Sequence, residues 1–213
     1  MSKPSEIYHT PIDLEDLVEK LDVTYDDLFC EEQNKNRHLY LFDTVSVEST
    51  AAIIQCILRY NIEDYGIDPA QRKPIKLYIH SGGGDVFSGF ALIDVMKASK
   101  TPVHTVNFGY AYSMAFLIAM AGDKRFSSEH GTFMLHDGSL SIENNAAKAE
   151  DFFVFTQLLK THEKEFVLAC SNLDSNEYET RYKDDWFMSA AEAKEKGFVD
   201  FLIGVDCELD DVL

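Results

Sequence analysis

A serine, a histidine and a pair of aspartates are the side chains of this sequence whose order suits acyl transfer. Ser113 stands where an apolar run begins, His136 follows the apolar segment 132–135, and Asp184 and Asp185 precede Trp186. Acyl transfer by serine needs a nucleophile, a base that takes its proton, and a carboxylate that orients the base. The chain order therefore permits a Ser-His-Asp triad.

Ser113 also has a simpler interpretation. The apolar run Met114–Ala121 is typical of a buried helix, and serine at the start of a helix most often caps it. The same position offers free N–H groups and a positive dipole to an oxyanion. No G-x-S-x-G motif is present, so the lipase type of nucleophile turn is not expected. Taken alone, the local pattern favours the helix cap.

Three consecutive glycines, Gly82–Gly84, separate an expected strand from an expected helix. Glycine permits a positive φ and brings bare N–H groups close to a bound group. The segment lacks the lysine and spacing of a phosphate loop, and G-x-G-x-x-G is absent, so nucleotide binding is not indicated. Its functional interpretation is an oxyanion hole beside a nucleophile.

Short apolar runs alternate with helical patterns, which predicts an α/β fold with a largely parallel sheet. We expect strands at His38–Phe42, Ile75–Ile79, Val103–Asn107, Arg125–Ser127, Thr132–Leu135 and Phe198–Ile203. We expect helices around Leu14–Leu21, at Glu48–Tyr60, over Phe87, Phe90 and Ala91 on one face, at Met114–Ala121 and at Ala146–Cys170, with a loop at Asn61–Pro74.

The helix expected at Ala146–Cys170 would be roughly 37 Å long at 1.5 Å per residue. This length exceeds what one compact layer covers, and the apolar stripe of the helix would be exposed in a monomer. We therefore expect part of the helix to pack against another chain. Near the end of the chain, Ser189 and Glu192 have the spacing of a capping box, and Gly197 is placed to end that helix.

Length and charge indicate one folded domain with acidic ends. The 213 residues carry 37 acidic and 19 basic side chains, a formal charge of −18, which is the wrong sign for a nucleic-acid partner. Residues 1–32 hold ten of the acids and residues 205–213 hold four. We therefore expect an acidic N-terminal segment at 1–32, a folded body at 33–204 and an acidic tail at 205–213.

The four cysteines are widely spaced and form no C-x-x-C pair, which indicates reduced thiols and a cytoplasmic location. The longest strongly apolar stretch, Ala111–Ala121, is too short to cross a bilayer, so no membrane association is expected. No metal site or cofactor is expected either.

Four motifs in this order resemble the proteolytic subunit of the Clp protease family (ClpP) over residues 37–204. They are Tyr78-Ile-His-Ser-Gly-Gly-Gly84, Gly109-Tyr-Ala-Tyr-Ser-Met114, Met134-Leu-His-Asp-Gly138 and Asp185-Trp-Phe-Met-Ser-Ala-Ala-Glu-Ala193. The resemblance implies that Ser113 is the nucleophile, His136 the general base and Asp185 the orienting acid, with the backbone N–H groups of Gly83 and Met114 as the oxyanion hole.

The resemblance also implies a ClpP/crotonase-like fold of repeated ββα units with a projecting handle helix. It implies a homo-oligomeric barrel of two stacked heptameric rings that hydrolyses unfolded polypeptides delivered by a separate AAA+ unfoldase. Two other readings are a ring subunit with a regulatory role and a crotonase-like acyl-CoA enzyme. The filled Ser, His and Asp positions favour the peptidase over both.

The sequence departs from the family pattern at several positions. Gly82 replaces a proline, Asp137-Gly138 replaces Gln-Pro, and Ser139–Asn145 replaces a glycine-rich strand that lines the substrate groove. Asp184 stands where many members have an arginine at the ring interface, and Lys76 where an aromatic residue helps to line the unfoldase docking pocket. These departures concern substrate preference, ring contact and partner docking.

Overall fold

The computed structural model describes residues 24–138 and 146–213, and the chain divides after Arg37 into two units that we describe separately. In the first unit, helix α2 spans Tyr25–Asn36, and Glu31 pairs with Lys35 one turn later at 3.0 Å. The helix expected around Leu14–Leu21 and the segment Ser139–Asn145 lie outside the described residues.

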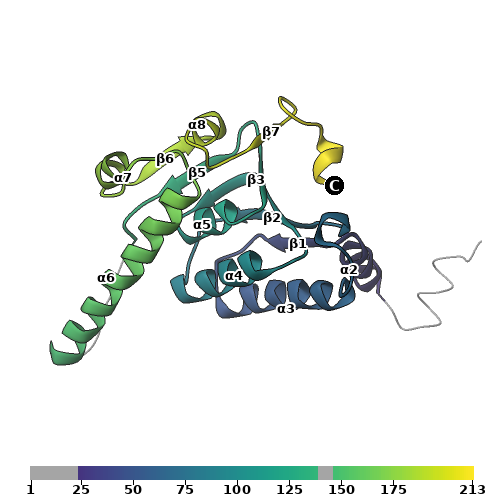
Figure 1. The fold of residues 1–213 in the computed structure, drawn as a ribbon, viewed down its shortest axis with the longest axis horizontal. Coiled ribbons are helices and arrows are strands. Elements are labelled where there is room, and N and C mark those ends of the chain that lie inside the picture. The colour runs from purple at the N-terminus through teal and green to yellow at the C-terminus, as the bar shows by residue number, and fades with distance from the viewer. Residues whose placement is uncertain (1–23, 139–145) are drawn as a thin grey trace, which may run out of the picture. The chain divides into compact units, whose positions relative to one another are not determined.

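The second unit alternates strands and helices, as Figure 1 shows. Its strands are β1 His38–Leu41, β2 Ile75–Ser81, β3 Val103–Tyr112, β4 Lys124–Ser128, β5 Thr132–Leu135, β6 Trp186–Ser189 and β7 Phe201–Ile203. Its α-helices are α3 Val47–Glu63, α4 Val86–Ala98, α5 Met114–Met120, α6 Ala146–Ala169, α7 Ser175–Arg181 and α8 Ala190–Glu195. Short 3-10 turns are η1 Pro69–Gln71 and η2 Leu209–Val212. The α/β prediction is confirmed.

The sheet is mostly parallel and branches at β3. Strands run in the order β1-β2-β3-β4-β7 with parallel pairing throughout. The first half of β3 pairs with β4, whereas Tyr110–Tyr112 pair with β5, and β6 then joins β5 in the antiparallel sense. Because β3 is long enough to pair with both β4 and β5, the ends of β3 and β5 lie side by side.

Helix α5 is buried on all sides, whereas α4 buries one face. Every residue of α5 is buried, in keeping with its apolar sequence. In α4 the buried face is formed by Ser88, Gly89, Leu92, Ile93 and Met96. Phe87 is instead half exposed and stacks against Phe155 of α6, with ring centroids 6.1 Å apart.

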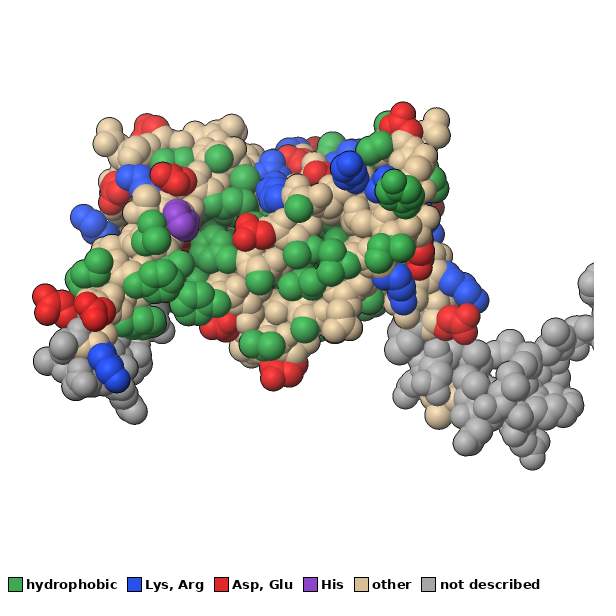
Figure 2. All heavy atoms as spheres, turned by 60° about the horizontal axis from the view of Figure 1, so that its bottom comes forward, with side chains coloured by type: hydrophobic (Ala, Val, Ile, Leu, Met, Phe, Trp, Pro, Cys, Tyr) green, Lys and Arg blue, Asp and Glu red, His purple; other side chains and the backbone are tan. Residues whose placement is uncertain are grey.

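Helix α6 is long and thinly covered. It extends beyond the sheet in Figure 1, which agrees with the projecting helix expected from the sequence. Among its described side chains only Thr156 and Val167 are buried. Its first half exposes Phe152, Phe153, Val154 and Phe155, and hydrophobic side chains gather at that end of the face in Figure 2.

Several element limits differ from the sequence prediction for identifiable reasons. β3 continues past Asn107 because β5 offers it a second partner, and α3 continues to Glu63 into the expected loop. β7 begins at Phe201, since Phe198 and Val199 belong to the turn after Gly197 and donate to the Ala193 carbonyl. α7 and β6 were not predicted, because both are short.

The end of the chain also corrects the predicted capping box. Ser189 Oγ accepts the Glu192 N–H at 3.2 Å, as expected, but the Glu192 carboxylate accepts from Trp186 Nε1 at 3.1 Å. Half of the motif is therefore present, and Gly197 ends α8 with φ +76° as predicted. No helix within residues 24–138 and 146–213 is both long and apolar enough to span a membrane.

Candidate active site

The branch of the sheet places Ser113 beside His136. Ser113 directly follows β3, and its N–H donates to the Met134 carbonyl of β5 at 2.8 Å, which continues the ladder between these strands. His136 directly follows β5. Its Nε2 lies 2.9 Å from Ser113 Oγ, a hydrogen-bond distance at which the serine hydroxyl donates to Nε2 when that nitrogen carries no proton.

Ser113 has an unusual backbone for a residue with a side chain. Its φ of 54° and ψ of −127° fall in a region that non-glycine residues rarely adopt, and such strain collects at functional sites. Although Ser113 stands at the N-cap of α5, its side chain makes no capping hydrogen bond. The cap interpretation is therefore wrong, and the hydroxyl is directed at His136 instead.

The antiparallel pairing of β5 with β6 sets Asp185 opposite His136. Leu135 pairs with Trp186. Because the strands are antiparallel, His136, which follows Leu135, lies opposite Asp185, which precedes Trp186. Asp185 Oδ1 lies 3.3 Å from His136 Nδ1, longer than a strong charge-assisted hydrogen bond. The His136 side chain is 24% exposed and that of Asp185 is 63% exposed. Of the two adjacent aspartates, Asp185 is the one that faces the imidazole.

The glycine turn lies against the backbone of Ser113 and Met114. Gly83 has φ +94°, and a Cβ on it would come within 2.7 Å of the Tyr112 carbonyl oxygen and 2.9 Å of the Met114 nitrogen. Any larger residue would push the turn away from the serine. Val45 anchors the turn by donating its N–H to the Gly83 carbonyl at 2.8 Å.

The two backbone N–H groups expected to form the oxyanion hole, those of Gly83 and Met114, differ in their hydrogen bonding. Met114 is the first residue of α5, where an N–H has no partner within the helix. The Gly83 N–H donates to Ser81 Oγ at 3.2 Å, and Ser81 Oγ donates to the Asp43 carbonyl at 2.6 Å. Ser81 is thus a neighbour that the sequence did not single out, and it holds one of the two donors.

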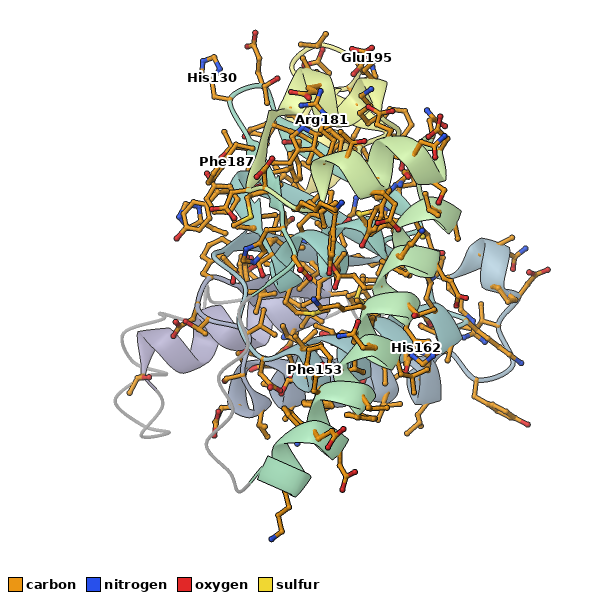
Figure 3. All side chains as sticks on the ribbon, turned by 90° about the vertical axis from the view of Figure 1, so that its left-hand side faces the viewer. His130, Phe153, His162, Arg181, Phe187 and Glu195 are labelled. Carbon is orange, nitrogen blue, oxygen red and sulfur yellow. The ribbon has the colours of Figure 1, made fainter. Side chains whose placement is uncertain are left out.

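Ser113 and His136 line a cavity of about 900 Å³. Its opposite wall is α6, and Figure 3 shows Phe153 on that helix and Phe187 on β6. Asp137 and Lys160 of the lining form an ion pair at 2.5 Å. The apolar lining consists of Val86, Phe87, Met114, Leu117, Met134, Phe152, Phe153 and Leu159. The cavity has room for a substrate side chain beside the serine.

Glu163 of α6 lines the same cavity and was missed in the sequence. Burial raises its pKa to about 7; the hydrogen bond from Tyr182 opposes that shift, Asp137 adds to it, and Lys160 opposes it. The signal was available, because Glu163 follows Leu159 by four residues and so interrupts the apolar stripe of the helix.

The described parts of the chain, 24–138 and 146–213, contain no cluster of three or more His, Cys, Asp or Glu side chains suited to a metal ion. What the arrangement offers is a hydroxyl, an imidazole and a carboxylate in sequence, next to a helix N-terminus. Among known protein families, the Clp protease family model matches residues 24–206, a range that includes every strand of the sheet.

Proposed function

Because the chain belongs to the Clp protease family, we propose that it is a serine peptidase in which Ser113, His136 and Asp185 form the catalytic triad. The observation that supports this most directly is the contact of Ser113 Oγ with His136 Nε2 at 2.9 Å, at the start of α5. A strained serine whose hydroxyl meets an imidazole suits nucleophilic catalysis better than a structural role.

The first half of the reaction forms an acyl-enzyme. Ser113 Oγ attacks the carbonyl carbon of the scissile peptide bond while His136 Nε2 takes the hydroxyl proton. His136 then gives this proton to the leaving nitrogen as the C–N bond breaks. In the second half, water attacks the ester with His136 again as the base, and the proton returns to Ser113 Oγ as the acid product leaves.

The negative oxygen of each tetrahedral intermediate needs backbone donors. The Met114 N–H supplies one, with the N-terminal dipole of α5 behind it. The Gly83 N–H becomes the second when it exchanges Ser81 Oγ for the substrate oxygen. Asp185 holds the tautomer that carries its proton on Nδ1 and stabilises the imidazolium, which makes it a positioning residue.

Members of this family generally form oligomeric rings with AAA+ partners. We extend this to the chain as a barrel of two stacked heptameric rings that receives unfolded polypeptide from a separate ATPase. The support is the row of exposed aromatic side chains on α6, which is an unusual surface for an isolated chain. Closure of a ring would cover every copy of that surface.

Labelling with a fluorophosphonate, followed by peptide mapping, tests the triad. We expect the label on Ser113 in the wild type and on no residue in Ser113→Ala. Ser171→Ala is the matched control, since its hydroxyl bonds the Val167 carbonyl away from the cavity, and it should label normally. Label on another serine would overturn the assignment.

The same experiment separates the peptidase from the two other readings. A ring subunit with a regulatory role predicts assembly without labelling, so the labelled fraction should be measured on a peak from a sizing column. A crotonase-like enzyme predicts binding of coenzyme A, which a thermal-shift measurement detects. The peptidase proposal expects labelling of the assembled peak and no shift with coenzyme A.

A further inference from the structure

Three carboxyl groups line the cavity: Asp85 caps α4, Asp137 pairs with Lys160, and Glu163 forms no ion pair with a described residue. The walls around it are largely apolar, and Ser113 and His136 lie on the opposite side of the same cavity. A substrate side chain that enters this cavity must therefore be next to the bond that Ser113 attacks. On α6 it meets the carboxyl group of Glu163, beside Thr156, Gln157 and Lys160.

The groups that face Glu163 come from α7 and the residue after it, and from the segment after β5. From α7 and the residue after it, the Tyr182 hydroxyl donates to Glu163 Oε2 at 3.2 Å, and the ring of Tyr178 stacks on Tyr182 at 4.8 Å. From the segment after β5, Asp137 is an acid, and it takes Lys160 as its partner at 2.5 Å. Within the described residues, Glu163 has no ion pair with any cation.

Partial burial disfavours the charged form of the carboxyl, and this raises the pKa of Glu163 to about 7 although Tyr182 and Lys160 act in the opposite direction. A cation brought into the cavity would relieve that cost. Lysine and arginine side chains have the matching form, because their long apolar stems lie along apolar walls while the charged tip reaches a carboxylate.

We propose that Glu163 is a specificity-determining residue which makes the cavity select a lysine or arginine side chain on the acyl side of the scissile bond. This rests on the proposed peptidase function and names its substrate class. Glu163 touches neither Ser113 nor the peptide bond in this proposal; it recognises the neighbouring side chain.

Reporter peptides test the proposal on the full-length, assembled protein. Four aminocoumarin amides that differ in their last residue, lysine, arginine, norleucine or glutamate, are compared by kcat/KM. At pH 8 we expect lysine and arginine to exceed norleucine by about 10- to 100-fold, the range for a hydrogen bond to a charged group. Glu163→Gln should reduce that ratio to near one by lowering kcat/KM for the lysine and arginine substrates.

The matched control is Glu165→Gln, an exposed carboxylate two residues away on the same helix, which should keep the wild-type ratio. The lysine-to-norleucine ratio should also fall about tenfold from pH 8 to pH 6 as Glu163 takes up a proton. His136 affects both substrates equally and cancels from this ratio. If Glu163 had only a structural role, the lysine-to-norleucine ratio of kcat/KM would not change with pH.

Binding separates failure of this inference from failure of the peptidase proposal. Fluorescent peptides ending in lysine or norleucine are titrated onto Ser113→Ala, which retains the cavity without the reaction. Tighter binding of the lysine peptide, lost in Ser113→Ala/Glu163→Gln, supports the inference even if no reporter is cleaved. Equal or tighter binding of norleucine, cleavage that favours norleucine or glutamate, or a ratio that Glu163→Gln leaves unchanged would overturn it.

Discussion

The two walls of the cavity are built in different ways. The wall that carries Ser113 and His136 comes from β3, α5 and β5, where the backbone is paired and α5 is entirely buried. The wall formed by α6 exposes aromatic side chains, and the pKa of its Glu163 carboxyl is raised by burial. One wall is held by strand pairing and a buried helix, whereas the other leaves large apolar side chains exposed.

This difference separates chemistry from recognition. The contact between Ser113 and His136 is fixed by strand pairing, so it needs no second chain and no substrate to form. We propose that helix α6 contacts a neighbouring subunit along its exposed aromatic residues and a substrate side chain at Glu163.

The largest effect is expected at the sheet wall. Ser113→Ala removes the nucleophile and should lower peptide hydrolysis by roughly 10⁴-fold or more, while the fold persists because the Ser113 N–H still bonds Met134. Hydrolysis of a fluorogenic peptide and the far-UV circular dichroism spectrum measure the two quantities. Residual activity within tenfold of the wild type would show that the sheet wall is not where the reaction takes place.

The two adjacent aspartates should separate next. Asp185→Asn presents the wrong imidazole tautomer and should lower kcat by roughly 10²- to 10⁴-fold with oligomer size unchanged. Asp184→Asn should alter the mass in solution with little change in kcat per assembled subunit. Steady-state kinetics and light scattering on the same samples decide, and equal loss of kcat in both variants with equal mass would mean that the two roles are misassigned.

At the α6 wall, Phe153→Glu should prevent assembly. Phe153 is 54% exposed in the single chain, so a charge there costs the isolated fold within about 0.5 kcal/mol, yet it would be buried unpaired between subunits. Light scattering should give a mass many times 24.2 kDa for the wild type and a much smaller mass for the variant. Val205→Glu, at an exposed site after β7, is the control and should assemble normally.

The carboxyl of the α6 wall should also leave a trace in stability against pH. The pKa of Glu163 is raised, so the folded state loses stability as pH rises from 4.5 through 7, and the full cost is present above pH 7. Glu163→Gln should therefore exceed the wild type in free energy of unfolding at pH 8, by at most about 3 kcal/mol, and match it near pH 4. Urea unfolding followed by Trp186 fluorescence measures this. A wild type more stable than the variant at pH 8 contradicts it.

The smallest effect concerns the glycine turn. Ser81→Ala releases the Gly83 N–H and removes the bond to the Asp43 carbonyl, so we expect a loss of about 1 kcal/mol in stability and a kcat that is kept or raised a few-fold. Thr105→Val is the control for the loss of stability. It removes a similar buried hydrogen bond, from the Thr105 hydroxyl on β3 to the Ala119 carbonyl on α5. A tenfold fall in kcat confined to Ser81→Ala would mean that Ser81 must hold the turn.

The sequence predicted the elements whose pattern is self-contained and missed those that depend on a partner. Thr132–Leu135 and the buried helix after Ser113 stand out because their apolar runs are bounded by polar residues. The extension of β3 beyond Asn107 is visible only once β5 lies beside it. The same holds for Phe87, which stacks on Phe155 of α6 and stays half exposed. No local pattern encodes this contact.

The site shows the same limit. Order along the chain suggested Ser113 and His136, and the family resemblance selected Asp185 from the aspartate pair. The strained backbone of Ser113, the engagement of Gly83 by Ser81 and the presence of Glu163 in the cavity are properties of the folded chain. They arise from contacts between segments far apart in sequence, so periodicity and spacing do not reveal them.

The antiparallel register of β5 and β6 has an evolutionary consequence. It fixes Asp185 opposite His136 from the two ends of a long excursion that contains α6 and α7. Because the register is set by the backbones of β5 and β6, a substitution on α6 or α7 changes a side chain without changing that pairing. A family built on this plan can diversify its substrates without reinventing its chemistry.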